Sequence, residues 1–150
     1  GYEELGRQPG VIPLGCLAHA RRKFHDVKEV SKKPGSAHEA LAFISKLYAI
    51  EKKGKALPSE EEVYALRQRE AKPILENFKR WLEKKHEQTP PRGLLGKAIQ
   101  YSLGQWDRLV RYIDDGMLLP DNNLALCAEI QNARKQEDPP LFPMNFIIAA

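Results

Sequence analysis

Three amphipathic helical patterns between residues 36 and 115 constrain the fold of this chain more than any other feature of its sequence. Apolar residues recur in them three and four positions apart, which places those residues on one face of a helix. Short segments rich in glycine, proline and serine separate the patterns, and such segments interrupt helices. Since the patterns occupy more than half of the 150 residues, we predict a mainly α-helical fold.

The first two patterns begin at signals for a helix N-terminus. Ser36 and Glu39 have the spacing of a capping box, with Ser36 as the cap. The helix that follows should run to about Lys53 and end at Gly54. Residues 58–62, with the sequence PSEEE, form a second capping box, and their carboxylates suit the positive end of the helix dipole.

Proline and glycine divide or end the later patterns. Pro73 lies inside the second pattern and should kink or split that helix, because proline donates no backbone hydrogen bond and its ring clashes with the preceding turn. The third pattern, residues 95–113, should form one helix. Asp114-Asp115-Gly116 supplies its stop, with Gly116 at a position that favours a left-handed residue.

The N-terminal part of the sequence differs from this helical middle. The apolar run VIPLGC, residues 11–16, predicts a short buried or edge strand. From Ala18 to about Val30 the pattern is helical, with Phe24 and Val27 inward and basic residues outward. A lone strand makes no sheet, so this one needs a partner from outside the chain or is not a strand.

Basic residues concentrate in the same N-terminal part. The net charge of the chain is +4, and residues 1–35 carry seven Lys and Arg against four Asp and Glu. Contact with a phosphate backbone requires a local basic patch of this kind. A solvated helix face is the alternative that charge alone leaves open. The cluster consists of Arg21, Arg22, Lys23, Lys28, Lys32 and Lys33.

Few other patterns point to chemistry. Cys16 and His19 have the C-x-x-H spacing of a zinc-ligand pair, but no second pair follows, so a buried cysteine at a strand end is the alternative. The sequence has no legible Ser–His–Asp arrangement and no glycine-rich phosphate loop. Two distant cysteines and the lack of an apolar run of about 18 residues lead us to expect a cytoplasmic protein with no membrane contact.

Residues 101–125, with the sequence YSLGQWDRLVRYIDDGMLLPDNNLA, combine a helix, its stop and a polar turn. Asp121, Asn122 and Asn123 in that turn are suited to start a further helix. Asp121 is the acidic residue best placed for a function, either as a helix cap or as a metal ligand. After Ala125 the sequence loses its periodicity and ends in an apolar tail.

Two segments together closely resemble the transposases of the bacterial insertion sequence 66 family. They are GCLAHARRKFHDV, residues 15–27, and the segment 101–125. Between them, LRQREAKPILENFKRWLEKK, residues 66–85, is similar to the helical insert of that family. The resemblance covers about residues 1–125, and the matching motifs include Cys16, Asp121, Asn122 and Asn123.

The resemblance implies a DNA strand-transfer enzyme with a ribonuclease-H-like α/β core, from which this chain would keep a strand and a helix. Enzymes of this type use an Asp-Asp-Glu triad to hold two divalent ions, and Mg²⁺ suits such oxygen ligands. The implied partners are the DNA ends of the insertion sequence and full-length transposase. The resemblance also implies that His19, Arg21, Arg22 and Lys23 face the DNA or support the active site.

The resemblance further implies that this chain holds neither of the flanking catalytic carboxylates. The family's second Asp stands directly before the residues that match Gly1-Tyr2, and its Glu directly follows DNN-x-A, where this chain has Leu126. Glu129 is a displaced candidate, but three residues turn a helix by about 300°, onto a different line. A frameshift in the coding DNA would explain the sequence after Ala125. We therefore expect no catalytic residue, metal site or cofactor in this chain.

The expected organisation has four parts. Residues 1–35 are a core remnant with the basic helix, and residues 36–116 are an all-helical insertion. Residues 117–125 are a turn that leads to the expected catalytic helix, and residues 126–150 are an aberrant, disordered tail. We expect a transposase fragment that is inactive on its own. The alternative is a non-catalytic helical module that regulates by binding DNA or transposase, with nucleoid association if it binds DNA.

Overall fold

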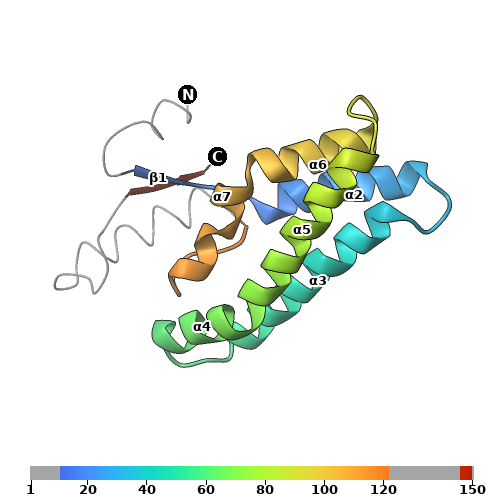
Figure 1. Ribbon diagram of the computed structural model, residues 1–150. Helices are drawn as coiled ribbons and strands as arrows, with labels where there is room; N and C mark the ends of the chain where they lie inside the picture. The colour runs from blue at the N-terminus through green and yellow to red at the C-terminus, as the bar shows by residue number, and fades with distance from the viewer. Residues whose placement is uncertain (1–10, 122–145, 150) are drawn as a thin grey trace.

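The computed structural model describes residues 11–121 and 146–149. This part of the chain is mainly helical, as predicted, and two short strands lie beside the bundle of helices (Figure 1). No helix in the described part is long and apolar enough to cross a bilayer. The elements are β1 (Val11–Leu14), α2 (Leu17–Val30), α3 (Ser36–Gly54), α4 (Glu60–Leu66), the π-helix η1 (Arg67–Ala71), α5 (Lys72–Gln88), α6 (Leu94–Gly104), α7 (Trp106–Val110), the 3₁₀-helix η2 (Arg111–Asp114) and β2 (Phe146–Ala149).

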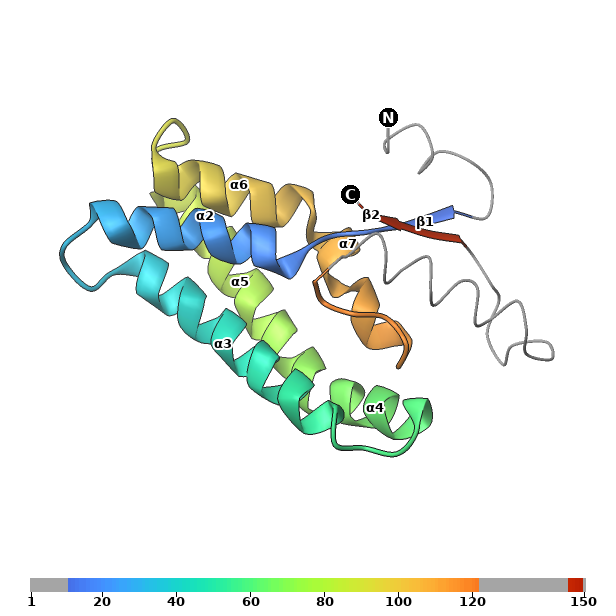
Figure 2. The same ribbon diagram turned by 180° about the vertical axis from the view of Figure 1, so that it is seen from behind.

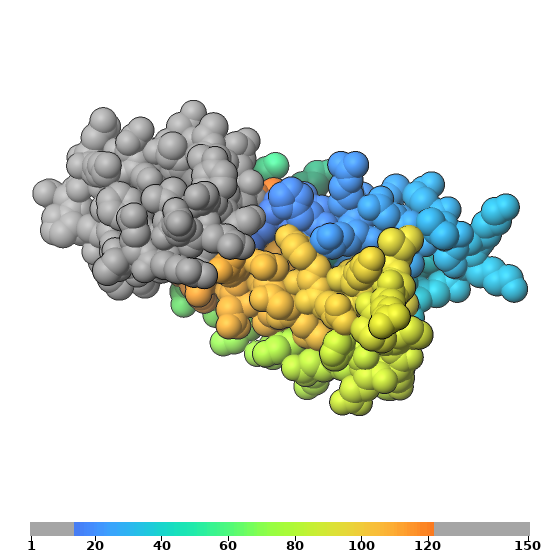
Figure 3. Space-filling model, turned by 90° about the horizontal axis from the view of Figure 1, so that it is seen from above, coloured from blue at the N-terminus to red at the C-terminus, as the bar shows by residue number. Residues whose placement is uncertain are grey.

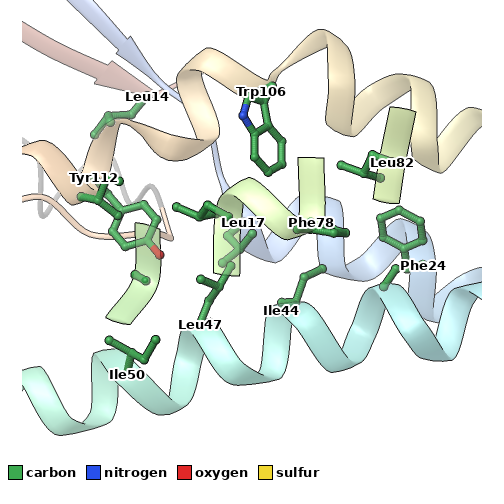
Figure 4. Packing of buried hydrophobic residues seen from close by; sticks show 14 of the residues in the cluster. Leu14, Leu17, Phe24, Ile44, Leu47, Ile50, Phe78, Leu82, Trp106 and Tyr112 are labelled. Atoms are coloured by element: carbon green, nitrogen blue, oxygen red, sulfur yellow. The ribbon is translucent and has the colours of Figure 1, made fainter. Parts of the chain in front are cut away.

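The four longest helices share one apolar core. Helix α2 packs against α3 and α6, and α5 packs against the same two helices. Figure 2 shows α2 between α6 and α3. In Figure 4, Ile44 and Leu47 on α3 point toward Leu17 on α2 and Phe78 on α5. All four of these side chains are buried, so the predicted apolar faces meet as their periodicity indicated.

Aromatic rings fill the centre of this core. Phe78 on α5 lies near Phe24 on α2, Phe43 on α3 and Trp106 on α7, with ring centroids 6.4, 5.1 and 5.8 Å apart. Pairs of this kind add roughly 0.5–1.5 kcal/mol each beyond the burial of their area. Because the rings come from four helices, they fix the orientation of α2 against the rest of the bundle.

The predicted strand is present, but its partner differs from the expected one. β1 pairs in parallel with β2, with Val11 opposite Phe146 and Leu14 opposite Ala149. The partner therefore lies within residues 126–150, the segment predicted to be disordered, and not outside the chain. Its sequence, FIIA, is rich in residues that favour strands, and an unpaired strand edge attracts such a segment. Residues 126–145 and 150 lie outside the described residues.

The two predicted capping boxes have different outcomes. Ser59 is an N-cap as predicted, and its Oγ accepts a hydrogen bond from the Glu62 N–H at 3.3 Å. Ser36 is not a cap but the first residue of α3. Gly35 precedes the helix there, and its N–H donates to Nδ1 of His38 at 3.3 Å. The spacing of Ser36 and Glu39 therefore predicted the N-cap of this helix one residue too late in the sequence.

Pro73 and the third pattern show how local geometry changes within a long helical stretch. The π-helix η1 ends two residues before Pro73, and α5 begins at Lys72, so the predicted split is confirmed. A π-helical turn is one way to accommodate the missing proline N–H. The third pattern, predicted as one helix, is broken into α6, α7 and η2. The break follows Gly104, at Gln105, whose backbone has φ −99° and ψ 5°.

Contact with the N-terminal segment accounts for this break. The Gly15 N–H donates to the Arg108 carbonyl oxygen at 2.9 Å, which brings the backbone of the segment after β1 against α7. A Cβ atom on Gly15 would lie 2.9 Å from the Leu109 backbone nitrogen, so only glycine allows this approach without a shift. Helix α7 therefore has to leave the axis of α6 to meet Gly15.

The prediction of a left-handed Gly116 is wrong. Its φ lies outside the left-handed range, and the need for glycine comes from packing instead. A Cβ atom on Gly116 would lie 2.1 Å from the Glu60 carbonyl oxygen. The turn after η2 therefore presses against the first residue of α4.

Arg67, in η1, is the largest fully buried polar side chain in the described part of the molecule, and it is 2% exposed. Its Nε and Nη2 donate to the two carboxylate oxygens of Glu51 on α3, at 2.9 and 2.7 Å. Nη1 donates to the carbonyl oxygens of Tyr112 and Asp115, at 2.7 and 2.8 Å. Nη2 also donates to the Leu118 carbonyl oxygen at 2.8 Å. All five guanidinium donors are therefore used.

We predict that Arg67→Met lowers the free energy of unfolding by about 3–5 kcal/mol, because it leaves the Glu51 carboxylate and three carbonyl groups without their donor. Arg67→Lys should recover only part of this loss, since an ammonium group lacks the fork that spans a carboxylate. Chemical denaturation of the chain measures both variants. Arg69→Met, an exposed neighbour in η1, is the control and should change stability by less than about 0.5 kcal/mol. Equal losses at Arg67 and Arg69 would contradict the role of the network.

The hydroxyl of Tyr112 is buried and has no hydrogen-bond partner among the described residues. Burial, and then the negative charge of Glu51, raise the pKa of this phenol above its ordinary value of 10.0. Since the folded-state pKa is raised, the stability linked to this proton is fully present below about pH 10 and is lost at higher pH.

We predict that Tyr112→Phe leaves the free energy of unfolding unchanged at pH 7 or raises it by up to about 1 kcal/mol, because an unsatisfied buried hydroxyl is removed. It should also reduce the loss of stability above pH 10. Tyr48→Phe is the control, since the Tyr48 hydroxyl donates a hydrogen bond, and it should be destabilising at pH 7. Denaturation curves at pH 7 and above pH 10 test both variants. A clear loss of stability in Tyr112→Phe at pH 7 would show that the hydroxyl has a partner.

Candidate nucleic-acid interface

The residues predicted to face DNA lie on the exposed side of α2. His19, Arg21, Arg22 and Lys23 are all exposed, because Leu17, Ala20 and Phe24 turn into the core. Figure 3 shows the outer surface of α2 beside that of α6. Among the described residues, neither the Arg21 side chain nor the Arg22 side chain forms a hydrogen bond or an ion pair. Their guanidinium groups are therefore available to a ligand.

These four side chains do not point the same way. Successive residues of an α-helix turn by roughly 100°, so His19, Arg22 and Lys23 share an arc of about 100°, while Arg21 points about 150° away from the middle of that arc. The Lys23 ammonium lies 4.8 Å from the centre of the Tyr101 ring on α6. The positive charge of Arg21, by contrast, acts on Tyr48 of α3 and lowers the pKa of that phenol, a smaller effect than the burial that raises it. We call His19, Arg22 and Lys23 the outer basic face of α2.

In space, Asp121 lies beside the first turn of α2, although Asp121 and Ala18 are 103 positions apart in sequence. Its Oδ1 accepts hydrogen bonds from the Ala18 N–H at 2.9 Å and from the Tyr48 hydroxyl at 2.6 Å. The carbonyl oxygen of the preceding Pro120 accepts from the Leu17 N–H at 2.9 Å. Asp121 therefore acts as a helix cap, as one of the two sequence interpretations had it, and the helix that it caps in the described part of the chain is α2. Asn122 and Asn123 lie outside the described residues.

The cap compensates for what the sequence before α2 lacks. Cys16 is in the N-cap position, and its side chain makes no capping hydrogen bond. The Cys16 carbonyl oxygen accepts from the N–H groups of His19 and Ala20, at 3.2 and 3.4 Å. Together with Asp121 and Pro120, it gives each of the first four N–H groups of α2 an acceptor. A carboxylate also suits the positive end of the helix dipole.

The Tyr48 hydroxyl stays protonated because its surroundings disfavour the phenolate. Burial raises its pKa most, followed by its hydrogen bond to Asp121 and by the negative charge of that carboxylate. The hydroxyl is therefore a fixed donor to Asp121 at all physiological pH values.

Neither Tyr48 nor Arg67 stood out in the sequence, because Tyr48 fits an apolar helix face and Arg67 sits among other charged residues.

The C-x-x-H pair divides between the interior and the surface. Cys16 is 6% exposed, whereas His19 is on the exposed side of α2. Within the described residues, no group of three or more His, Cys, Asp and Glu side chains gathers in a way that could hold a metal ion.

Comparisons with known proteins cover both the basic helix α2 and the segment that ends at Asp121. The family described as "Transposase IS66 family" matches residues 1–126. Two proteins of Sinorhizobium fredii, named uncharacterized proteins y4jD and y4hP, are 34% identical over 129 residues and 31% identical over 121 residues. These matches take in 82% and 73% of this chain but 25% and 22% of the relatives. No solved structure matches.

The chain thus spans about a quarter of the length of the curated relatives that it matches. The family match begins at the first residue, includes the exposed basic helix and the Asp121 cap, and ends at the residue after Ala125. A family match over more than half of the sequence is decisive for membership: this chain belongs to the IS66 transposase family.

Proposed function

We propose that this chain contributes to DNA binding in transposition through the outer basic face of α2. The observation that carries the proposal is the exposure of Arg22 on the helix that holds the family motif, with no partner among the described residues. His19 and Lys23 flank it on the same arc. Arginine and lysine side chains presented in this way bind phosphate groups of a DNA backbone and release counterions. The ends of the insertion sequence are the proposed DNA.

We also propose that the segment from β1 to α2 is a remnant of a ribonuclease-H-like core. A short parallel strand that runs directly into a helix is consistent with an α/β unit, and the family motif spans this junction. Residues 36–116 are then the helical insertion. In this proposal the basic helix belongs to the core and the remaining helices hold it in place.

The proposed fragment is catalytically inactive on its own. The family's Glu position holds Leu126, whose side chain cannot bind a metal ion. The Mg²⁺ ions of the intact family would supply activation of a nucleophile and charge stabilisation. The donor set described here does not fit them, because Asp121 is a lone carboxylate that caps α2 and no group of three or more metal-binding side chains gathers among the described residues. No step of strand transfer is therefore assigned to these residues.

A regulatory module is the second candidate. The buried Arg67 network and the aromatic cluster give residues 14–118 a core of their own, which a binding module needs. Such a module would associate with full-length transposase or with its DNA. Both candidates imply a cytoplasmic location, with nucleoid association when DNA is bound.

We predict that the chain binds insertion-sequence ends with an affinity that falls as salt rises, because phosphate contacts release counterions. Arg22→Gln should weaken binding and reduce the slope of log K against log salt by about one. Fluorescence anisotropy with labelled duplexes measures both. Arg80→Gln, an exposed arginine on α5, removes the same charge away from α2 and is the control. Equal effects of the two variants would contradict a contact at Arg22.

A second experiment tests inactivity. Incubation of the chain with Mg²⁺ or Mn²⁺ and insertion-sequence ends should give no cleavage and no joining of strands. Products in this assay would contradict the proposal of an inactive fragment. Co-purification with full-length transposase, together with weak DNA binding by the chain alone, would favour the regulatory candidate.

A further inference from the structure

We infer that Asp121 is a positioning residue, which ties the turn after η2 to the start of the basic helix so that the two keep one fixed arrangement. This inference rests on the proposed function, since it concerns the helix that is proposed to contact DNA. It goes beyond that function in assigning a task to the aspartate of the DNN motif. That task is structural coupling between two family motifs.

The contacts of Asp121 come from two separate elements. Ala18 on α2 is 103 positions away in sequence and Tyr48 on α3 is 73 positions away, and both donate to the same carboxylate oxygen. The adjacent Pro120 carbonyl binds the Leu17 N–H. Three hydrogen bonds therefore converge on two consecutive residues. Pro120 is buried and the bond from Tyr48 is partly buried, so water competes weakly for these two acceptors, whereas the bond from Ala18 lies at the surface.

The cap also limits how α2 can meet DNA. A free helix N-terminus attracts phosphate through its unpaired N–H groups. Here those groups already have acceptors, and the acceptor nearest to the surface is a negatively charged carboxylate. Phosphate contacts must therefore come from side chains on the outer basic face of α2. The cap sets the direction of that face, because it holds the end of the helix where His19 and Arg22 are located.

Asp121 is also the last described residue before the position at which the family places its catalytic Glu. Because Asp121 is hydrogen-bonded to α2 and α3, it fixes the point from which the following chain continues. In an intact relative, the same contacts would set the distance between the DNA-facing helix and the catalytic helix. The Asp of DNN would thus hold the DNA-facing helix and the catalytic helix in a fixed arrangement, and would not be a metal ligand.

Stability measurements test the coupling by Asp121 in this chain. Asp121→Ala should lower the melting temperature by about 2–8 °C, the scale of a lost helix cap in a chain of this size. Asp121→Asn should recover most of the loss, because asparagine is an equally good cap. Combining Asp121→Ala with Tyr48→Phe should cost less than the sum of the two, since both remove the same hydrogen bond. Hydrogen exchange should quicken at the Ala18 amide in Asp121→Ala.

DNA binding distinguishes positioning from mere stability. Measured well below every melting temperature, the affinity of Asp121→Ala should fall roughly threefold or more, the scale of an effect transmitted through contacts. Its salt slope should stay unchanged, because no phosphate contact is lost. Asp26→Asn removes a negative charge from the exposed side of α2 without touching the cap, and its affinity should stay the same or rise.

The outcomes separate the two proposals. If wild-type chain does not bind DNA, the proposed function fails. The melting temperatures, the non-additivity and the hydrogen exchange of the Ala18 amide still test whether Asp121 couples the turn after η2 to α2 and α3. If wild-type chain binds DNA and the affinity of Asp121→Ala rises as in Asp26→Asn, Asp121 acts only as a charge and the inference is overturned. Additive effects of Asp121→Ala and Tyr48→Phe would overturn it as well.

Discussion

The guanidinium group of Arg67 is the interaction on which the remaining structure depends. Residues 112–118 lie in the short 3₁₀-helix η2 and the turn after it, so their carbonyl groups lack the partners that a continuing α-helix would supply. Burying such groups without a hydrogen bond costs free energy, and the apolar core cannot offset that cost locally. Arg67 satisfies three of these carbonyls and Glu51 neutralises its charge. The segment after η2 can therefore lie against α3 and α4 and not in solvent.

The same segment is held at its other end by the cap on α2. Arg67 binds it up to Leu118, and α2 and α3 bind it at Pro120 and Asp121. Apolar packing positions the four long helices, but polar bonds position the stretch that links them to the DNN motif. Because each of these bonds has a defined direction, they specify one path for the chain where side-chain burial alone would allow several.

Features that depend on local sequence were predictable. The helices follow from apolar periodicity, Ser59 from a capping signal, and the split before Pro73 from the missing N–H. The same periodicity predicted that the basic residues of α2 face outward. The expectations for Ser36 and Gly116 failed because a one-residue shift of a cap, or a close approach of Glu60, leaves no trace in the neighbouring sequence.

Features that depend on contacts distant in sequence were not predictable. The break at Gln105 arises because α7 meets Gly15, and β1 finds its partner more than 130 residues later. Arg67 looks like one more surface charge in a segment with the sequence RQREA. A helix cap was one of the two interpretations of Asp121, yet nothing in the sequence could say that the capped residue lies 103 positions earlier.

These contacts show how residues 36–116, the proposed helical insertion, are tied to the segments on either side of them. An insertion that packed only on itself would separate the basic helix from the DNN motif by a flexible connection. Here α3 supplies Tyr48 to the cap, and α3 and η1 supply Glu51 and Arg67 to the turn, so the insertion touches the chain on both sides of its own boundaries. Residues 36–116 therefore hold α2 and Asp121 in one arrangement, and the relative positions of the segments on either side of them depend on the packing of these helices.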